Sequence, residues 1–253
     1  MTMFASAFRS AVLWCVSAAL IALWVPLVAA AWLVDGDPVK RRTGRTFRAL
    51  GVVLARLHRA RLHLQREDLP DPERHYVVVS NHQSLADIPV LCHLPWEMKW
   101  LAKAELFRLP FVGWMMRLAA DIPVHRGRRA KAADALRRAS RTLESGCSIM
   151  VFPEGTRSRD GRVAPFSDGA FHLALRTRAP ILPVAVDGSG GCLPRGTWLF
   201  GPPSEIRMRV FPPVETRDRD PSDVAALREQ VHRAIAHQVA AWRGADAIEV
   251  QDE

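Results

Sequence analysis

The sequence contains little cysteine and none of the motifs of nucleotide-binding enzymes. Its four cysteines are scattered without a C-x-x-C pair, which argues against a zinc site or a disulfide framework and indicates free thiols. There is no Walker A motif, no G-x-G-x-x-G fingerprint and no G-x-S-x-G turn. Nucleotide chemistry and a serine nucleophile therefore have no support, and a nucleophilic hydroxyl is expected to come from a substrate.

Tyrosine is nearly absent, whereas basic residues are in excess. The chain of 253 residues has one tyrosine and a formal net charge of +9. The charge indicates an anionic partner: nucleic acid, an anionic membrane surface or a phosphorylated substrate. The lack of an RNP-like aromatic motif counts against nucleic acid, which leaves the other two.

Charged residues are missing from one long run near the N-terminus. Everything between Arg9 and Asp35 is uncharged, long enough to span a bilayer or to lie deep in one leaflet. Basic residues cluster after the run, between 40 and 48, which predicts that the rest of the chain is cytoplasmic. The alternative is a signal peptide cleaved near 29–31, but the run is longer than a normal signal-peptide core.

A basic amphipathic segment follows. Between residues 43 and 64, leucines recur at helical spacing with arginines between them, which predicts a helix. Two interpretations stay open: the helix lies on an anionic membrane, or it packs on the domain as an ordinary surface helix. Prolines at 70 and 72 end this segment. We expect a membrane-associated helical region over 1–68 and an α/β domain over 69–253.

The rest of the chain alternates between apolar runs and helical patterns. Strands are expected near 76–79, 98–102, 120–124, 148–152, 181–186 and 205–211. Helices are expected near 84–92, 111–119, 129–144, 168–177 and 221–242. This alternation predicts an α/β fold, with a mixed, mostly parallel sheet flanked by helices and preceded by the hydrophobic and amphipathic helices of the N-terminus.

A histidine and a carboxylate follow the first of these strands in VVVSNHQSLADIP. His82 comes directly after the polar turn Ser80-Asn81, so it would lie at the carboxyl end of the strand. In open α/β sheets, ligands bind at this end of the strands. With His82 at the start of a helix, Asp87 would lie a little over one turn further on. The pair can act as a general base and its orienting carboxylate. Taken alone it is also the kind of spacing that a chain with nine histidines shows by accident.

Further charged residues follow other strands. In FPEGTRS, Gly155 permits close backbone approach, Arg157 offers a planar fork for phosphate, and Glu154 can organise the loop or accept a substrate hydroxyl. Lys103 and Arg126 each follow a strand and can converge with Arg157 on one phosphate. The plainer interpretation is a polar turn with solvated cations.

The order of these motifs resembles the glycerolipid acyltransferase family. NHQSLAD is similar to its N-H-x4-D block and FPEGTRS to its F-P-E-G-T-R-S block, with AKAEL, PFVGW, GAFHLA and ILPVAVDGS as further matches. The resemblance covers about Tyr76 to Gly191. One departure is Asp168, where the family often has a lysine, so the resemblance leaves the acceptor open between lysophosphatidic acid and another lyso-lipid such as lyso-ornithine lipid.

The resemblance implies roles for single residues. His82 would be the catalytic base and Asp87 its orienting partner. The implied substrate-binding residues are Lys103, Arg126, Glu154, Gly155, Arg157 and Pro183.

It also implies the reaction and its setting. The expected reaction is transfer of an acyl group to the sn-2 hydroxyl of lysophosphatidic acid, on the cytoplasmic face of a bacterial inner membrane. The donor would be acyl-CoA or acyl carrier protein thioester, with no metal or prosthetic group. A non-catalytic protein that binds membranes or acidic lipids is the alternative from another class.

Overall fold

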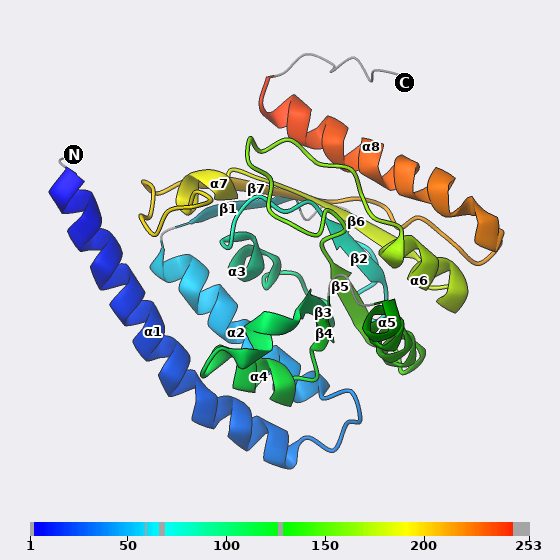
Figure 1. The fold of residues 1–253 in the computed structure, drawn as a ribbon, viewed down its shortest axis with the longest axis horizontal. Coiled ribbons are helices and arrows are strands. Elements are labelled where there is room, and N and C mark those ends of the chain that lie inside the picture. The colour runs from blue at the N-terminus through cyan, green and yellow to red at the C-terminus, as the bar shows by residue number, and fades with distance from the viewer. Residues whose placement is uncertain (1–2, 59, 66–68, 126–128, 245–253) are drawn as a thin grey trace.

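A computed structural model describes residues 3–58, 60–65, 69–125 and 129–244. Within these residues a seven-stranded sheet forms the centre, and helices cover both of its faces (Figure 1). The predicted α/β class is therefore confirmed.

The strands are short and mostly parallel. Their bounds are β1 Arg61–Gln65, β2 Val77–Ser80, β3 Met98–Lys103, β4 Ile122–Val124, β5 Ser148–Val151, β6 Ile181–Asp187 and β7 Glu205–Val210. Their order across the sheet is β1-β7-β6-β2-β5-β3-β4, and only the β6–β7 pair is antiparallel in the described sheet. The carboxyl ends of β2, β3, β4, β5 and β6 therefore share one edge, where α/β proteins bind ligands.

The helices follow the predicted pattern with small shifts. Their bounds are α1 Met3–Val34, α2 Arg41–Leu57, α3 Asp87–Leu91, η1 Ala104–Arg108, α4 Val112–Leu118, α5 Arg129–Glu144, α6 Gly169–Thr177, α7 Ser189–Cys192, η2 Pro221–Asp223 and α8 Val224–Trp242. The helix expected near 84–92 begins only at Asp87, and the one expected near 221–242 opens with the short 3-10 turn η2.

The two faces of the sheet bury separate apolar cores. Val77 and Val79 of β2 point to the face covered by α5, α6 and α8, where Phe171 is fully buried. Val78 points to the opposite face, where it packs with Trp100 and with residues of α3. This alternation is the two-residue period of a strand buried on both sides.

The apolar helix α1 lies beside α2, on the side of the sheet that α3 covers (Figure 1). The segment Phe4–Val34 is long and apolar enough to cross a membrane, and little of it is buried. Hydrogen bonds still tie it to the rest of the chain: Arg9 donates to the carbonyl of Phe200, and Trp24 Nε1 donates to the carbonyl of Thr46. Hydrogen bonds at two positions along α1 thus hold this helix against the folded domain.

One ion pair of α2 and a hydrogen bond from a buried lysine to the residue before α2 attach this helix to the sheet. Arg48 of α2 pairs with Asp121 just before β4. Lys99 of β3 is fully buried, pairs with Glu97 at 2.7 Å and donates to the carbonyl of Lys40 at 2.9 Å. A buried lysine needs such partners because an unpaired charge is costly to desolvate.

The structure corrects the end of the amphipathic segment predicted over 43–64. The helix α2 ends at Leu57, and the residues Arg61–Gln65 form the edge strand β1, paired in parallel with β7. In β1 the apolar Leu62 and Leu64 alternate with polar residues, which is the period of a strand. The sheet therefore begins at Arg61, before the expected domain start at residue 69.

Candidate active site

His82 and Asp87 meet at the carboxyl end of β2. Nδ1 of His82 lies 2.7 Å from Oδ2 of Asp87; the Asp87 side chain is fully buried and that of His82 is 14% exposed. His82 lies in the loop before α3, not at the start of a helix as the sequence predicts, because the helix begins at Asp87 itself. The predicted contact is present, and it is made by a tight loop.

The Asp87 carboxylate organises this loop. Its Oδ2 also accepts the backbone N–H groups of Gln83 at 2.7 Å and Ser84 at 2.9 Å. Since an ionised carboxylate only accepts hydrogen bonds, neutral His82 carries its proton on Nδ1 and presents the Nε2 lone pair. The arrangement suits removal of a proton from an incoming hydroxyl.

Glu154 joins the two motifs through their backbones. Its Oε1 accepts the N–H of His82 at 2.6 Å, and its Oε2 accepts the N–H of Ala164 at 3.0 Å. In return the carbonyl of His82 accepts the N–H of Ser158 at 2.8 Å. Burial raises the pKa of the Glu154 carboxyl above its usual value. Both carboxylate oxygens thus accept backbone N–H groups. Of the two roles expected for Glu154 from sequence, these hydrogen bonds correspond to organising the loop.

Phe152 supports the imidazole from one side. Its ring stacks on that of His82, with centroids 4.0 Å apart and an interplanar angle of 16°. The ring of Trp100 lies edge-on to that of Phe152, with ring centroids 6.0 Å apart. Together with Asp87, this stack holds the plane of the His82 ring.

Two of the three predicted phosphate ligands, Lys103 and Arg157, follow parallel strands on the same edge of the sheet as His82. Lys103 is the last residue of β3, pairs in register with Val124 of β4, and is exposed, with Glu105 as a distant partner at 3.9 Å. Arg157 is partly buried in the loop after β5. Arg126 lies outside the described residues. The shared role of these three cations stays a prediction.

The loop that carries Arg157 depends on a glycine. Gly155 has φ +68°, which favours glycine, and its N–H closes a turn onto the carbonyl of Phe152 at 3.1 Å. No atom of the described residues lies within 4 Å of a Cβ built there, so the backbone angle, not crowding, is what requires glycine.

Two other residues singled out from the sequence have structural surroundings of their own. Pro183 is buried within β6, in register with Val79 of β2, where it packs inside the sheet. Asp168, the anion in place of a family lysine, accepts a hydrogen bond from Arg228 at 2.6 Å. Its carboxylate therefore pairs with a cation of α8.

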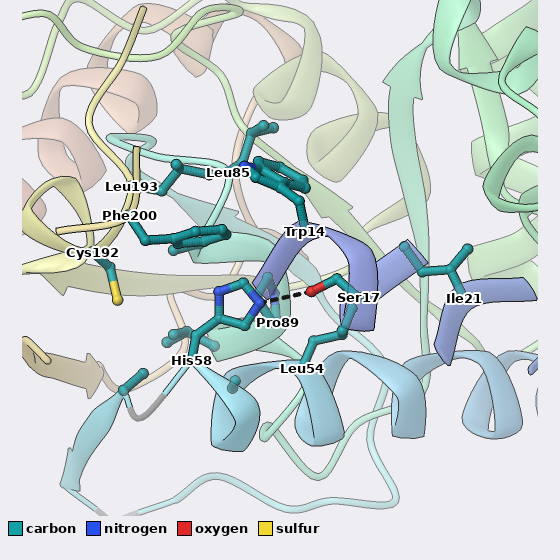
Figure 2. A pocket seen from close by; sticks show the side chains of 14 residues that line it. Trp14, Ser17, Ile21, Leu54, His58, Leu85, Pro89, Cys192, Leu193 and Phe200 are labelled. Carbon is teal, nitrogen blue, oxygen red and sulfur yellow. Dashed lines mark hydrogen bonds between the residues drawn. The ribbon is translucent and has the colours of Figure 1, made fainter. Parts of the chain in front are cut away.

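An apolar cavity of about 180 Å³ opens beside the His82 loop (Figure 2). It lies between α1, α2, α3 and the segment after α7, and Leu85 and Pro89 line it close to Asp87 in the chain. The other lining residues are Trp14, Ser17, Ile21, Leu54, Ala55, His58, Ala60, Ala86, Val90, Cys192, Leu193 and Phe200. A cavity of this composition suits an alkyl chain.

One polar pair lies in this cavity. Ser17 Oγ is 3.0 Å from His58 Nε2, and the His58 ring contacts Phe200 edge-on at 4.2 Å (Figure 2). Burial lowers the pKa of His58 below its usual value. The sequence analysis did not single out His58, because the three elements that surround it are distant in the chain.

Known acyltransferases are similar to this chain in sequence. A family model described as Acyltransferase matches residues 61–187. The chloroplastic 1-acyl-sn-glycerol-3-phosphate acyltransferase BAT2 of Brassica napus is 36% identical over 148 residues, 58% of this chain and 43% of that protein. The mouse 1-acyl-sn-glycerol-3-phosphate acyltransferase alpha is 36% identical over 166 residues, 65% of this chain and 58% of that protein. The chain spans about half the length of these curated relatives.

One solved structure resembles nearly the whole chain. The crystal structure of the 1-acyl-sn-glycerophosphate acyltransferase from Thermotoga maritima aligns with a TM-score of 0.80 and 26% identity, covering 94% of this chain and 98% of that one. The likeness therefore includes the N-terminal helices as well as the sheet.

Proposed function

The chain belongs to the acyltransferase family, and we propose that it is a membrane-bound 1-acylglycerol-3-phosphate O-acyltransferase. It moves a fatty acyl group from a thioester, acyl-CoA or acyl carrier protein, to the sn-2 hydroxyl of 1-acyl-sn-glycerol-3-phosphate, which gives phosphatidic acid. The relatives named above carry this activity in their names. No prosthetic group is proposed, because the thioester is a co-substrate.

The contact between His82 and Asp87 is the observation that carries the proposal. Nε2 of His82 takes the proton of the sn-2 hydroxyl as its oxygen attacks the thioester carbonyl. The C–S bond then breaks, and the proton on Nε2 passes to the departing thiolate. Asp87 stabilises the imidazolium between these steps.

Positioning of the acceptor falls to the cations on the same edge. Lys103, Arg126 and Arg157 hold the phosphate so that the neighbouring hydroxyl reaches His82. The apolar cavity that begins at Leu85 receives one fatty acyl chain. Burying each methylene group there contributes about 0.8 kcal/mol of binding free energy.

The membrane supplies both lipid substrates. Apolar side chains of α1, among them Phe4, Phe8, Leu23 and Leu33, are exposed, and we place them in the hydrocarbon of the bilayer. The basic residues after α1 favour the cytoplasmic face of a bacterial inner membrane. Vesicle flotation at high salt tests the attachment by α1. Hydrophobic attachment by this helix resists salt, whereas purely electrostatic binding does not.

The reaction is tested with detergent-purified protein, lysophosphatidic acid and palmitoyl-CoA, following thiol release and phosphatidic acid. We expect His82→Ala to lower kcat by about a hundredfold or more. The matched control is His237→Ala, because His237 is an exposed histidine on α8. Full activity of His82→Ala would refute the catalytic assignment, and vesicle binding without any transfer would favour a lipid-binding protein.

A further inference from the structure

A second cavity lies beside the catalytic loop, and it is polar. Its volume is about 380 Å³. We propose that it binds the phosphate of the carrier that brings the acyl thioester, which is the phosphopantetheine phosphate or the nucleotide phosphates of coenzyme A. This assignment rests on the acyl transfer proposed above and names the donor side of the same site.

The cavity wall is rich in guanidinium groups. Arg159, Arg195 and Arg243 line it, and the remaining lining residues are Gln83, Ser158, Asp160, Gly161, Asp187, Gly188, Gly190, Gly191 and Pro194. Guanidinium groups bind phosphate through paired hydrogen bonds. The chemistry of the wall therefore favours a phosphorylated ligand.

The carboxylates of the wall are already engaged. Asp187 accepts hydrogen bonds from Arg243 at 2.6 Å and from Gln83 at 3.1 Å. Asp160 accepts from the Ser158 hydroxyl at 3.1 Å. Arg243 is thus neutralised by Asp187.

Two arginines keep their charge available. Within the described chain, Arg159 has no hydrogen-bond or salt-bridge partner, and the Arg195 guanidinium donates only to the backbone carbonyl of Arg157. Neither has a carboxylate partner in the described residues, so together they leave the cavity with a positive charge.

The cavity adjoins the loop that carries His82. Gln83 is the next residue in the chain, and its amide donates to Asp187 at the end of β6. In the sheet β2 lies between β6 and β5. Arg195 follows β6 and Arg159 follows β5, so the cavity lies at the carboxyl end of β2, and its wall meets the loop of Arg157 where Arg195 donates to the Arg157 carbonyl. The guanidinium groups of the cavity wall therefore lie beside the loop that carries His82.

Two segments of the chain contribute lining residues to both cavities. In the loop that carries His82, Gln83 faces the polar cavity while Leu85 faces the apolar one. After β6, Arg195 belongs to the polar cavity while Leu193 belongs to the apolar one. An acyl thioester has the same division, with an alkyl chain on one side of the reacting carbonyl and a phosphorylated arm on the other. A donor laid across this loop would bring its thioester to His82.

The test compares donors that differ in phosphate. Palmitoyl-pantetheine lacks the phosphate that palmitoyl-phosphopantetheine, palmitoyl-CoA and palmitoyl-acyl carrier protein contain. We expect Arg159→Gln and Arg195→Gln each to raise KM about tenfold for phosphorylated donors. The wild-type preference for palmitoyl-phosphopantetheine over palmitoyl-pantetheine should fall by the same factor. An effect limited to palmitoyl-CoA would identify its nucleotide phosphates as the ligand, and an equal effect on all three would identify the phosphate they share.

The control is Arg217→Gln, because Arg217 is exposed in the segment before η2, away from both cavities. Its kinetic constants should match those of the wild type. A rise in KM for lysophosphatidic acid instead of the donor would overturn the proposal, as would an equal loss with palmitoyl-pantetheine.

A binding experiment keeps the cavity apart from the reaction. Equilibrium dialysis of the whole protein with coenzyme A, without acyl chain or acceptor, should show binding that Arg159→Gln weakens about tenfold and Arg217→Gln does not. Binding of this kind without acyl transfer would contradict the proposed function but support the phosphate site. Acyl transfer with the same donor KM in both arginine variants and the wild type would support the proposed function and contradict the phosphate site.

Discussion

Oε1 of Glu154 accepts the backbone N–H of His82 at a distance of 2.6 Å, although the two residues are 72 positions apart in the sequence. The carboxylate therefore fixes the backbone at the histidine, while its second oxygen holds Ala164. A side chain used in this way positions the histidine through its backbone.

Glu154→Gln should lower kcat more than it raises KM. The glutamine amide can accept only through its single oxygen, so its NH2 group faces one of the two backbone N–H donors. Leaving that donor unpaired costs about 1–3 kcal/mol. Steady-state kinetics on both substrates measures the split. A large rise in the KM for lysophosphatidic acid with kcat unchanged would instead show direct substrate binding by Glu154.

Asp87→Asn should abolish most transfer while the protein stays folded. Asparagine keeps the size of the side chain and an oxygen for the N–H groups of Gln83 and Ser84, but it cannot stabilise the imidazolium. We expect kcat to fall by about a hundredfold or more. Circular dichroism provides the folding control. Near-normal kcat in a folded variant would exclude Asp87 as the orienting carboxylate.

Filling the apolar cavity should shift the preferred acyl chain. Ala60→Phe places a ring among the lining residues, so the space left fits a shorter chain. We expect the ratio of rates with palmitoyl-CoA to lauroyl-CoA to fall by about tenfold, since each excluded methylene forfeits about 0.8 kcal/mol. The same substitution at the exposed Ala226 of α8 is the control. An unchanged ratio would mean that no donor chain enters this cavity.

Gly44→Ala should loosen α2 from the sheet. A Cβ at position 44 would overlap the carboxylate of Glu97, next to the buried ammonium of Lys99, so the ion pair would have to move. Removing one partner of a buried pair costs about 3–5 kcal/mol, so displacing Glu97 from Lys99 should lower the free energy of unfolding by an amount up to that range. Thermal unfolding compares this variant with Gly36→Ala, because a Cβ at Gly36 has none of the described atoms within 4 Å. Equal melting temperatures would contradict the tight contact.

His58 should make the protein less stable in acid. Burial lowers its pKa below the usual 6.5, so the unfolded chain binds a proton more readily than the folded one. Its stabilising contribution is complete above pH 6.5 and is lost as the pH falls through its folded-state pKa. His58→Phe should flatten the decline in Tm between about pH 7 and pH 5. A decline as steep as that of the wild type would assign it to other groups.

The sequence alone was sufficient for most of the elements and for the contact between His82 and Asp87. Two-residue and helical periods are local properties of side chains, so the strands from β2 to β7 lie within two residues of their expected bounds. His82 and Asp87 are close in the chain, and a short loop is enough to bring them together.

Tertiary contacts decided the rest. Leucines between 43 and 64 fit a helix and a strand, and only pairing with β7 makes Arg61–Gln65 a strand. The hydrogen bond from His82 to Glu154, the placement of Ser17 against His58, and the guanidinium groups beside Gln83 join segments far apart in sequence. Such contacts depend on how the layers pack, which no local pattern of residues records.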